Sequence, residues 1–153
     1  MLVRPERYKT MSAVFLIIVK DGKVLLQKRK DTGYCDGWYD CGASGHVEAD
    51  ESTKQAAVRE LAEELRVEIP MDRLDLATTI HIRSNDKVYY YFYFALELAG
   101  DEEFDFVINE PDKNDELIWV DLNHLPDRLI DYNQIAIHNY QEGIPYSEIG
   151  WNY

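Results

Sequence analysis

Residues 45 to 67 read GHVEADESTKQAAVRELAEELRV, a stretch that concentrates acidic side chains on one face of a predicted helix. Ser52 followed by Gln55 has the pattern of a capping box, and good helix formers then continue without Gly or Pro. We therefore expect a helix from 52 to about 65. At helical spacing, the apolar stripe that faces the core consists of Val58, Leu61, Ala62 and Leu65.

A separate face of this helix gathers three glutamates, Glu60, Glu63 and Glu64. Like charges three and four residues apart repel by roughly 0.2–0.5 kcal/mol per exposed pair, so the cluster favours a counter-charge. Mg²⁺ or Mn²⁺, which prefer hard oxygen ligands, would supply it. The alternative is a solvated acidic face that Arg59 and Lys54 partly neutralise. Ala56 and Ala57 are expected beside the acidic face, where small side chains would leave room for a bulky polyanion and its metals.

The spacing of this stretch resembles the signature of the Nudix hydrolases, G-x5-E-x7-R-E-U-x-E-E-x-G-U, in which U is a bulky aliphatic residue. Eight of its nine defined positions match, at Gly45, Glu51, Arg59, Glu60, Leu61, Glu63, Glu64 and Val67. On average residue usage, a chance match of this quality is on the order of one in 10^8. The resemblance implies the α/β/α sandwich of that family, with a mixed β-sheet.

One signature position departs, because Arg66 stands where the family has its last glycine. A glycine just after a helix usually adopts a left-handed cap, a conformation less favourable for arginine by about 1 kcal/mol. Arg66 either adopts that conformation or extends the last turn, with Pro70 as the stop. The run Cys-Gly-Ala-Ser-Gly at 41–45 also differs from the Pro-Gly-Gly turn of many family members, so we expect a slightly different phosphate-binding loop.

The resemblance implies hydrolysis of a diphosphate bond in a nucleoside diphosphate linked to another group, with a nucleoside triphosphate or related nucleotide as the favoured substrate. It implies Mg²⁺ as cofactor, with Mn²⁺ as a substitute. The implied metal ligands are Glu60, Glu63 and Glu64, together with a backbone carbonyl near Ser44 or Gly45. Glu60 is also the first candidate for general base. Arg59 is expected to orient these carboxylates, and Glu51 to steady the loop or the metal ligands.

The acidic segment 100–116 offers two further carboxylates. Members of the family often supply another glutamate from the loop ahead of their last strand. Glu116 has a similar place, directly before a strand at 117–120, and is the second candidate for general base. Glu110 lies one short loop earlier and is a further candidate metal ligand. In the alternative reading, both belong to a solvated acidic loop.

Two residues are candidates for contacts with the substrate. Arg29 ends the segment LLQKR at 25–29, which resembles the family's LL-x-x-R, whose arginine often contacts a phosphate or a base. A solvated cation at the end of a strand is an equally good reading of it. Trp38 would stack on a base or pack over the sheet, and packing is favoured. Neither residue identifies the nucleotide.

Two alternatives to a hydrolase stay open. The first is a Nudix domain that binds a nucleotide as a regulatory module without cleaving it, although the retained arginine and glutamates of the signature argue against this. The second is an isopentenyl diphosphate isomerase, which shares the fold and a Gly-His pair in the signature. That reaction typically uses a cysteine immediately before the pair, where this chain has Ser44.

The remaining sequence predicts strands on both sides of the helix. The predicted elements are a loose lead-in at 1–10, strands at 12–19, 23–30, 74–82, 87–98 and 117–120, and a C-terminal helix at 127–142. Asp21-Gly22 marks a two-residue hairpin turn between the first two strands. Residues 88–94 are aromatic on both faces, which suits a central strand that is covered on both sides. This order fits a mixed sheet with helices on both faces.

The chain has 153 residues, 46% of them hydrophobic, so we expect a single domain over 1–153. Its formal net charge of -13 argues against binding to nucleic acid or anionic membrane, and a phosphate substrate then needs metal ions as intermediaries.

The apolar run at 11–19 is too short to span a bilayer. Cys35 and Cys41 indicate neither a disulfide framework nor a zinc site, so the expected setting is the cytoplasm. A homodimer is the expected assembly only because it is the commonest symmetric one.

Overall fold

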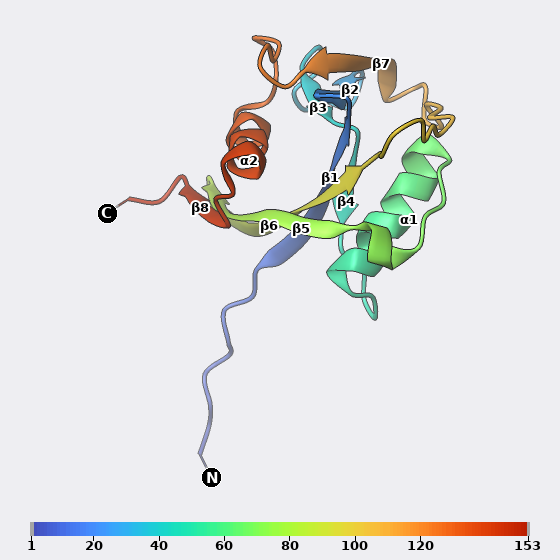
Figure 1. The fold of residues 1–153 in the computed structure, drawn as a ribbon. Helices are drawn as coiled ribbons and strands as arrows, with labels where there is room; N and C mark the ends of the chain where they lie inside the picture. Colours follow the sequence, from blue (N-terminus) through green and yellow to red (C-terminus); the bar gives the residue numbers. More distant parts are fainter. Residues whose placement is uncertain (1, 153) are drawn as a thin grey trace.

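The computed structural model describes residues 2–152 and consists of one mixed β-sheet between two helices (Figure 1). In chain order the elements are β1 Met11–Lys20, β2 Lys23–Arg29, β3 Tyr39–Cys41, β4 Ala43–His46, α1 Thr53–Leu65, the 3-10 helix η1 Met71–Arg73, β5 Asp75–Ser84, β6 Lys87–Glu97, β7 Asn114–Asp121, α2 Asp131–Glu142 and β8 Tyr146–Ile149. Figure 1 shows α1 and α2 on opposite sides of the sheet. The expected α/β/α sandwich is therefore confirmed.

The strand order in the sheet is β3-β2-β1-β6-β5-β8, with β4 beside β1 and β7 beside β2. β1 runs parallel to β6, whereas β5 and β6 are antiparallel. β6 has a neighbour on each edge and sends side chains into the cores on both faces of the sheet. The prediction that the aromatic segment forms a central strand is confirmed.

The first two strands form the predicted hairpin, with Asp21 and Gly22 at φ angles of 51° and 74° in its turn. β1 and β2 pair only at the two positions next to this turn. Farther from the turn, β1 pairs with β4 instead, and Gly45 lies opposite Val14. This separation of the hairpin strands admits β4 to the sheet and brings Gly45 beneath α1.

Alternating side chains of β1 divide the interior into two cores. The core on the α1 side contains Val14, Leu16 and Ile18 with Leu61 and Leu65, and the core on the α2 side contains Ala13, Phe15 and Ile17 with Ile137. Burial of each large aliphatic or aromatic side chain contributes about 1.5–3 kcal/mol to folding. Both helices are therefore held to the sheet by apolar contacts.

The face of α1 that packs on the sheet differs in part from the expected stripe. Its two leucines are fully buried as expected, but Val58 and Ala62 are only partly buried. Ala56 and Ala57 are fully buried, so the expectation that they leave room for a polyanion is wrong. Their small side chains instead allow the first turns of α1 to pack closely on the sheet.

α2 begins at Asp131, whereas the sequence predicts a start at 127. The segment before it runs alongside β3, where the Tyr39 N–H donates to the carbonyl of Arg128 at 2.8 Å and the Ile130 N–H donates to the carbonyl of Tyr39 at 3.1 Å. These bonds keep the segment out of the helix. The short strands β3, β4 and β8 are not predicted by the sequence.

Residues 2–10 have no regular secondary structure, in agreement with the expected lead-in. The acidic segment expected as a loop at 100–116 is a loop only as far as Lys113, because β7 begins at Asn114 through its pairing with β2, so Glu116 lies within a strand and not ahead of it. No helix among the described residues is long and apolar enough to cross a membrane.

Candidate active site

α1 begins with the predicted capping box. The Ser52 hydroxyl accepts a hydrogen bond from the Gln55 N–H at 3.1 Å, and the Gln55 side chain accepts one from the Ser52 N–H at 2.7 Å. At the other end, Arg66 has φ 56° and ψ 35°, and its N–H donates to the carbonyl of Ala62 at 3.1 Å. The helix therefore ends in a left-handed cap as it would with glycine. The alternative in which Arg66 extends the last turn is wrong.

The Arg66 side chain fastens the acidic loop to the end of α1. Its Nε donates to Asn109 Oδ1 at 2.6 Å. Asn109 in turn donates from Nδ2 to the carbonyl of Glu63 at 2.7 Å and from its N–H to the carbonyl of Glu64 at 2.9 Å. These bonds satisfy carbonyl groups that a helix end otherwise leaves to water. The loop is thereby held to α1 just before Glu110.

Arg59 contacts several carboxylates at once, as expected for an orienting residue. It bonds both carboxylate oxygens of Glu51, from Nη2 at 2.8 Å and from Nε at 3.0 Å. Its Nη1 contacts Glu60 Oε1 at 2.7 Å and Glu63 Oε2 at 3.2 Å, and its Nη2 donates to the carbonyl of His46 at 3.0 Å. The hydrogen bonds from Arg59 lower the pKa of Glu51 to about 2.

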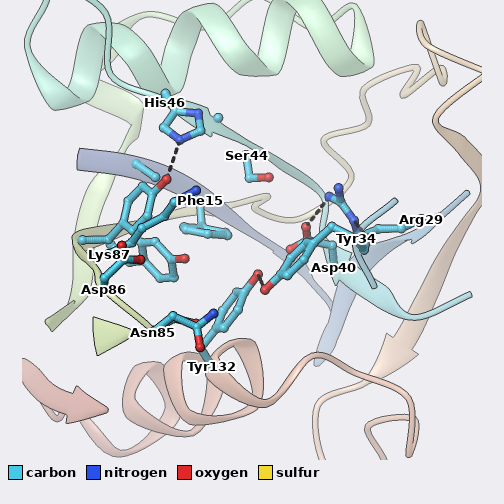
Figure 2. A pocket seen from close by; sticks show the side chains of 15 residues that line it. Phe15, Arg29, Tyr34, Asp40, Ser44, His46, Asn85, Asp86, Lys87 and Tyr132 are labelled. Carbon is cyan, nitrogen blue, oxygen red and sulfur yellow. Dashed lines mark hydrogen bonds and ion pairs between the residues drawn. The ribbon is translucent and has the colours of Figure 1, made fainter. Parts of the chain in front are cut away.

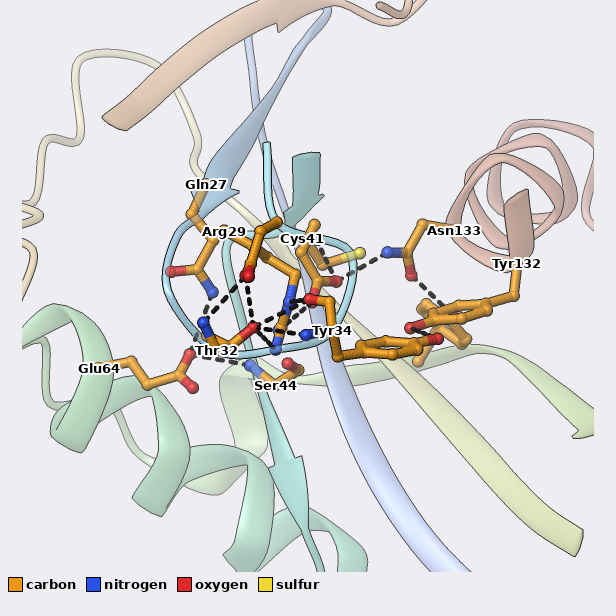
Figure 3. A network of polar contacts seen from close by, with 12 residues as sticks. Gln27, Arg29, Thr32, Tyr34, Cys41, Ser44, Glu64, Tyr132 and Asn133 are labelled. Atoms are coloured by element: carbon orange, nitrogen blue, oxygen red, sulfur yellow. Dashed lines mark hydrogen bonds and ion pairs between the residues drawn. The ribbon is translucent and has the colours of Figure 1, made fainter. Parts of the chain in front are cut away.

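Glu64 points toward the sheet from α1 (Figure 3). Its Oε2 accepts hydrogen bonds from the Ser44 N–H at 3.0 Å and from Gln27 Nε2 at 3.3 Å. Burial nevertheless raises the pKa of Glu64 to about 8. Burial also raises the pKa of Glu60, and Arg59 opposes that rise. Both glutamates therefore lie where the ionised form lacks sufficient counter-charge.

Gly45 leaves the space that the Glu60 carboxylate occupies. A methyl group in place of its hydrogen would collide with the Glu60 carboxylate. The backbone of Gly45 is not in the left-handed region, so the requirement for glycine is one of space. β4 and α1 thus enclose a carboxylate between them at the start of the signature.

This set of oxygen donors fits a hard divalent cation, which would supply the missing counter-charge. The predicted ligands Gly45, Glu63, Glu64 and Glu110 all lie around Glu60. Glu110 is near enough for its charge to raise the pKa of Glu60, and it pairs with Lys113 at 3.4 Å. Among residues 2–152, no three acidic, His or Cys side chains already converge as a metal cage, because Glu60 and Glu63 turn toward Arg59.

Glu116 does not join this cluster. Gln27 on β2 reaches Glu64 beneath α1, and its partner on β7 is Leu117, which packs on the α1 side. Glu116 is one position along the strand, so its side chain faces α2. There it accepts a hydrogen bond from the Tyr39 hydroxyl at 3.3 Å. This position does not support Glu116 as a general base for chemistry at α1.

A cavity of ≈ 400 Å³ lies on the α2 side of the sheet (Figure 2). Its aromatic walls are formed by Phe15 on β1, Tyr89 and Tyr91 on β6, Tyr132 on α2 and Tyr34 in the loop after β2. Part of the aromatic segment of β6 therefore lines a cavity, and Phe92, Tyr93 and Phe94 pack in or against the two cores as expected, whereas Tyr90 is half-buried and stacks on His81. β4 contributes Ser44 and Gly45 to the lining, and these residues also contact Glu64 and Glu60. The cavity adjoins the glutamates across this one strand.

Of the two predicted substrate contacts, Arg29 lines the cavity and Trp38 does not. Arg29 Nε donates to the carbonyl of Tyr34 at 2.8 Å, and Nη2 donates to the Thr32 hydroxyl at 3.2 Å. Arg29 Nη1 contacts Asp40 Oδ2 at 3.2 Å. Arg29 therefore organises the loop after β2 and is not a freely solvated cation. Trp38 is 36% exposed and lies outside the cavity lining, whereas Tyr34 of the same loop lines the cavity.

Asp40, which is not among the residues predicted from the sequence, is a buried carboxylate in the cavity lining. Its Oδ1 accepts hydrogen bonds from the Cys41 N–H at 2.8 Å and from Asn133 Nδ2 at 2.7 Å. Asn133 Oδ1 accepts in turn from the Tyr93 hydroxyl at 2.8 Å. Burial raises the pKa of Asp40, and Arg29 opposes that rise. In the sequence Asp40 stands out only as a single charged residue between Tyr39 and Cys41, which is weak evidence for a buried carboxylate at a binding site.

Comparison with known proteins agrees with this site. The family model of the NUDIX domain matches residues 9–140. The CTP pyrophosphohydrolase of Escherichia coli (strain K12) is 47% identical over 60 residues, which are 39% of this chain and 44% of that protein. The match thus spans less than half the length of this relative.

Several solved structures have the same fold. The MutT NUDIX hydrolase from Burkholderia pseudomallei has a TM-score of 0.74 at 25% identity, covering 86% of this chain and 98% of that one. The MutT protein from Methanosarcina mazei Go1 has a TM-score of 0.72 at 20% identity, covering 91% and 98%. A bifunctional NMN adenylyltransferase/ADP ribose pyrophosphatase from Francisella tularensis, complexed with AMP and Mn, has a TM-score of 0.70 at 17% identity, covering 88% and 42%. The last two show likeness of fold alone. Since the family model spans most of a chain whose signature arginine and glutamates meet on α1, this protein belongs to the Nudix hydrolase family.

Proposed function

We propose that this chain is a pyrophosphohydrolase that cleaves a diphosphate bond in a nucleoside triphosphate or a related small nucleotide. The observation that carries the proposal is the position of Ser44 and Gly45, which contact the glutamates of α1 and also line the aromatic cavity. A nucleotide with its base in the cavity would extend its phosphates across β4 toward those glutamates. The Escherichia coli relative is named as a CTP pyrophosphohydrolase, which supports the same reaction.

The metal ligands that we propose for Mg²⁺ are Glu60, Glu63, Glu64, Glu110 and a backbone carbonyl at Ser44 or Gly45. The cation would neutralise substrate phosphate charge in a chain of net charge -13 and lower the pKa of the attacking water. The Glu63 side chain is 54% exposed, so it can leave Arg59 for the cation without disturbing the core. The Mn ion in the Francisella tularensis structure makes Mn²⁺ the natural substitute in assays.

The residues of the chain mainly have to position the substrate and a water molecule, because phosphoryl transfer needs little covalent chemistry from the protein. Arg59 bonds Glu60 through Oε1, and we assign Glu60 Oε2 to accept the proton of the attacking water. Glu51 holds Arg59 in place from the other side. Water then adds to one phosphorus of the diphosphate, and a nucleoside triphosphate yields a monophosphate and pyrophosphate.

We propose a cytoplasmic setting for this reaction, a proposal with which the two free cysteines agree. A single domain and a homodimeric assembly stay predictions.

The test is incubation of the purified protein with Mg²⁺ or Mn²⁺ and a panel of nucleotides. The panel comprises nucleoside triphosphates, oxidised nucleotides, ADP-ribose, dinucleoside polyphosphates and NADH. We expect metal-dependent cleavage by the wild type, with turnover lower by about 10-fold or more in Glu63→Gln and Glu64→Gln. Tight nucleotide binding without cleavage of any compound would identify a regulatory module instead of an enzyme.

A further inference from the structure

We propose that Asp40 makes this site selective for nucleotides whose base carries an amino group, such as cytosine or adenine, over analogues with a carbonyl oxygen in its place. The inference deepens the proposed function and rests on it for the assignment of the cavity to the base.

The walls of the cavity accept a planar ring without choosing among bases. Phe15 and Tyr91 have ring centres 4.8 Å apart, and Tyr132 meets Tyr91 edge-on at 5.1 Å. Aromatic side chains stack on any nucleobase, because every base presents a π-face. Discrimination between bases therefore requires a polar group inside the cavity.

Asp40 is the enclosed charge that meets this requirement. Asp86 in the turn after β5 and Lys87 at the start of β6 also line the cavity, but both are exposed, and water screens their charge. Asp40 is only 2% exposed. Arg29, the remaining charged side chain of the lining, is engaged with the loop and with Asp40 itself. A polar contact to Asp40 would form away from competing water.

The hydrogen bonds of Asp40 leave one acceptor position open. A carboxylate has two oxygens, each with two lone pairs. Oδ1 accepts from the Cys41 N–H and from Asn133 Nδ2, whereas among the described residues Oδ2 contacts Arg29 Nη1, at 3.2 Å. Burial raises the pKa of Asp40, but the contact with Arg29 and the hydrogen bonds to Oδ1 oppose that rise and stabilise the ionised form, which accepts hydrogen bonds and donates none. Oδ2 can therefore receive one further N–H from a ligand.

An exocyclic amino group matches this oxygen, and a carbonyl oxygen does not. The amino group donates a hydrogen bond, whereas a carbonyl at the same position would place two acceptors against each other in a water-poor site. Sites built around a buried polar group reject analogues that leave it unpaired. We expect kcat/KM for CTP to exceed that for UTP by about 10-fold or more.

The loop after β2 lines the cavity and contacts α2 there. The Tyr34 and Tyr132 hydroxyls lie 3.3 Å apart and join the loop to α2, as Figure 2 shows. Asp36 stabilises the same loop by accepting hydrogen bonds from the N–H groups of Thr32 at 2.9 Å and Gly33 at 3.0 Å. Asp36 does not line the cavity, so it provides a matched control for Asp40.

The experiment compares kcat/KM for CTP against UTP and for ATP against ITP, two pairs in which the base carries an amino group or a carbonyl oxygen at one position. The wild type should prefer the amino member by about 10-fold or more in whichever pair it hydrolyses. In Asp40→Asn the preference should fall below about 3-fold, because a carboxamide presents either an oxygen or an N–H. Asp36→Asn should keep the wild-type preference. Thermal unfolding establishes that both variants are folded.

Equal kcat/KM within each pair, or a preference for the carbonyl member, would overturn the role of Asp40 while leaving the hydrolase intact. A folded Asp40→Asn with the full preference would overturn it as well. If the protein hydrolyses no nucleotide, the proposed function fails, and titration with CMP and UMP tests the inference by itself. Tighter binding of CMP to the wild type and not to Asp40→Asn supports the inference, and equal binding of the two monophosphates overturns it.

Discussion

Glu63 and Glu64 lie side by side in the sequence but in different surroundings. Glu64 accepts hydrogen bonds from Ser44 and Gln27 beneath the helix, whereas the Glu63 side chain is more than half exposed. Neither belongs to the apolar core, and a glutamine at 64 can still accept from the Ser44 N–H. We expect Glu63→Gln and Glu64→Gln to fold normally and to lower kcat by about 10-fold or more through lost metal binding. Steady-state kinetics with Mg²⁺ and thermal unfolding measure both effects. Wild-type turnover in the two variants would contradict their assignment as metal ligands.

The glutamates of α1 are predictable from sequence because a helix alone places residues three and four apart on one face. Asp40 and Tyr34 are not predictable in this way. Tyr34 in the loop after β2 and Asp40 on β3 both contact α2, across segments about a hundred residues apart in the sequence. The same tertiary contact decides that Tyr34, and not Trp38, lines the cavity.

At the level of the element, α1 is held to the sheet by one buried row of side chains. Leu61 is fully buried in the core on the α1 side, whereas Val58, three residues earlier, is only partly buried. We expect Leu61→Ala to lower the free energy of unfolding by about 2–5 kcal/mol, and Val58→Ala to lower it by clearly less. Urea denaturation of the two variants measures the difference. Equal losses would show that the two positions pack on the sheet equally.

The end of α1 combines an unfavourable backbone angle with a favourable side-chain contact. The left-handed conformation costs arginine about 1 kcal/mol relative to glycine, so Arg66→Gly would remove that cost. The substitution would also remove the hydrogen bond from the Arg66 side chain to Asn109. We therefore expect a net change in stability within about 1 kcal/mol. Asn109→Ala should destabilise the wild type more than it destabilises Arg66→Gly, with a coupling of about 0.5–3 kcal/mol.

Urea denaturation of the four proteins in this double-mutant cycle measures the coupling between Arg66 and Asn109. Additive effects of the two substitutions would show that the side-chain bond does not hold the loop to the helix.

Length decides which elements the sequence predicts. The β1–β2 hairpin, β5 and β6 have seven or more residues each with clear patterns, and their predicted bounds agree closely with the structure. β3, β4 and β8 have three or four residues, too few to show a periodicity, and they form because neighbouring strands offer them partners. The start of α2 is displaced by the pairing of the preceding segment with β3, which local propensity does not reveal.

At the level of the whole molecule, our proposal assigns different parts of the substrate to the two faces of the sheet. The face toward α1 carries the glutamates for the phosphates, and the face toward α2 carries the cavity for the base. β4 separates them and takes part in both. The early separation of the β1–β2 hairpin admits β4 to this position, so the topology of the sheet creates the site.

Two carboxylates affect the stability of the whole chain with opposite sign. Without a bound cation, Glu64 has a pKa of about 8 in the folded chain against 4.5 as its ordinary value. From about pH 5 to about pH 8 the unfolded chain therefore loses this proton before the folded chain does, and stability falls as pH rises. Glu51 has a pKa of about 2 in the folded chain, so above its ordinary pKa of 4.5 it is ionised in both the folded and the unfolded chain. Its contribution to stability is therefore constant over this range. We expect the Tm in EDTA to fall from about pH 5.5 to about pH 8.

Mg²⁺ should reverse this loss, because a cation that binds the ionised Glu64 stabilises the folded chain most where that form prevails. Glu64→Gln is the matched control, since it keeps the shape of the side chain without the titrating group. In EDTA its Tm should fall less steeply with pH than that of the wild type, and Mg²⁺ should raise its Tm less at about pH 8. Scanning calorimetry of both proteins at the two pH values, with EDTA or Mg²⁺, measures both quantities. Equal slopes in EDTA would contradict the burial of a protonated Glu64, and an equal response to Mg²⁺ would remove Glu64 from the proposed metal ligands.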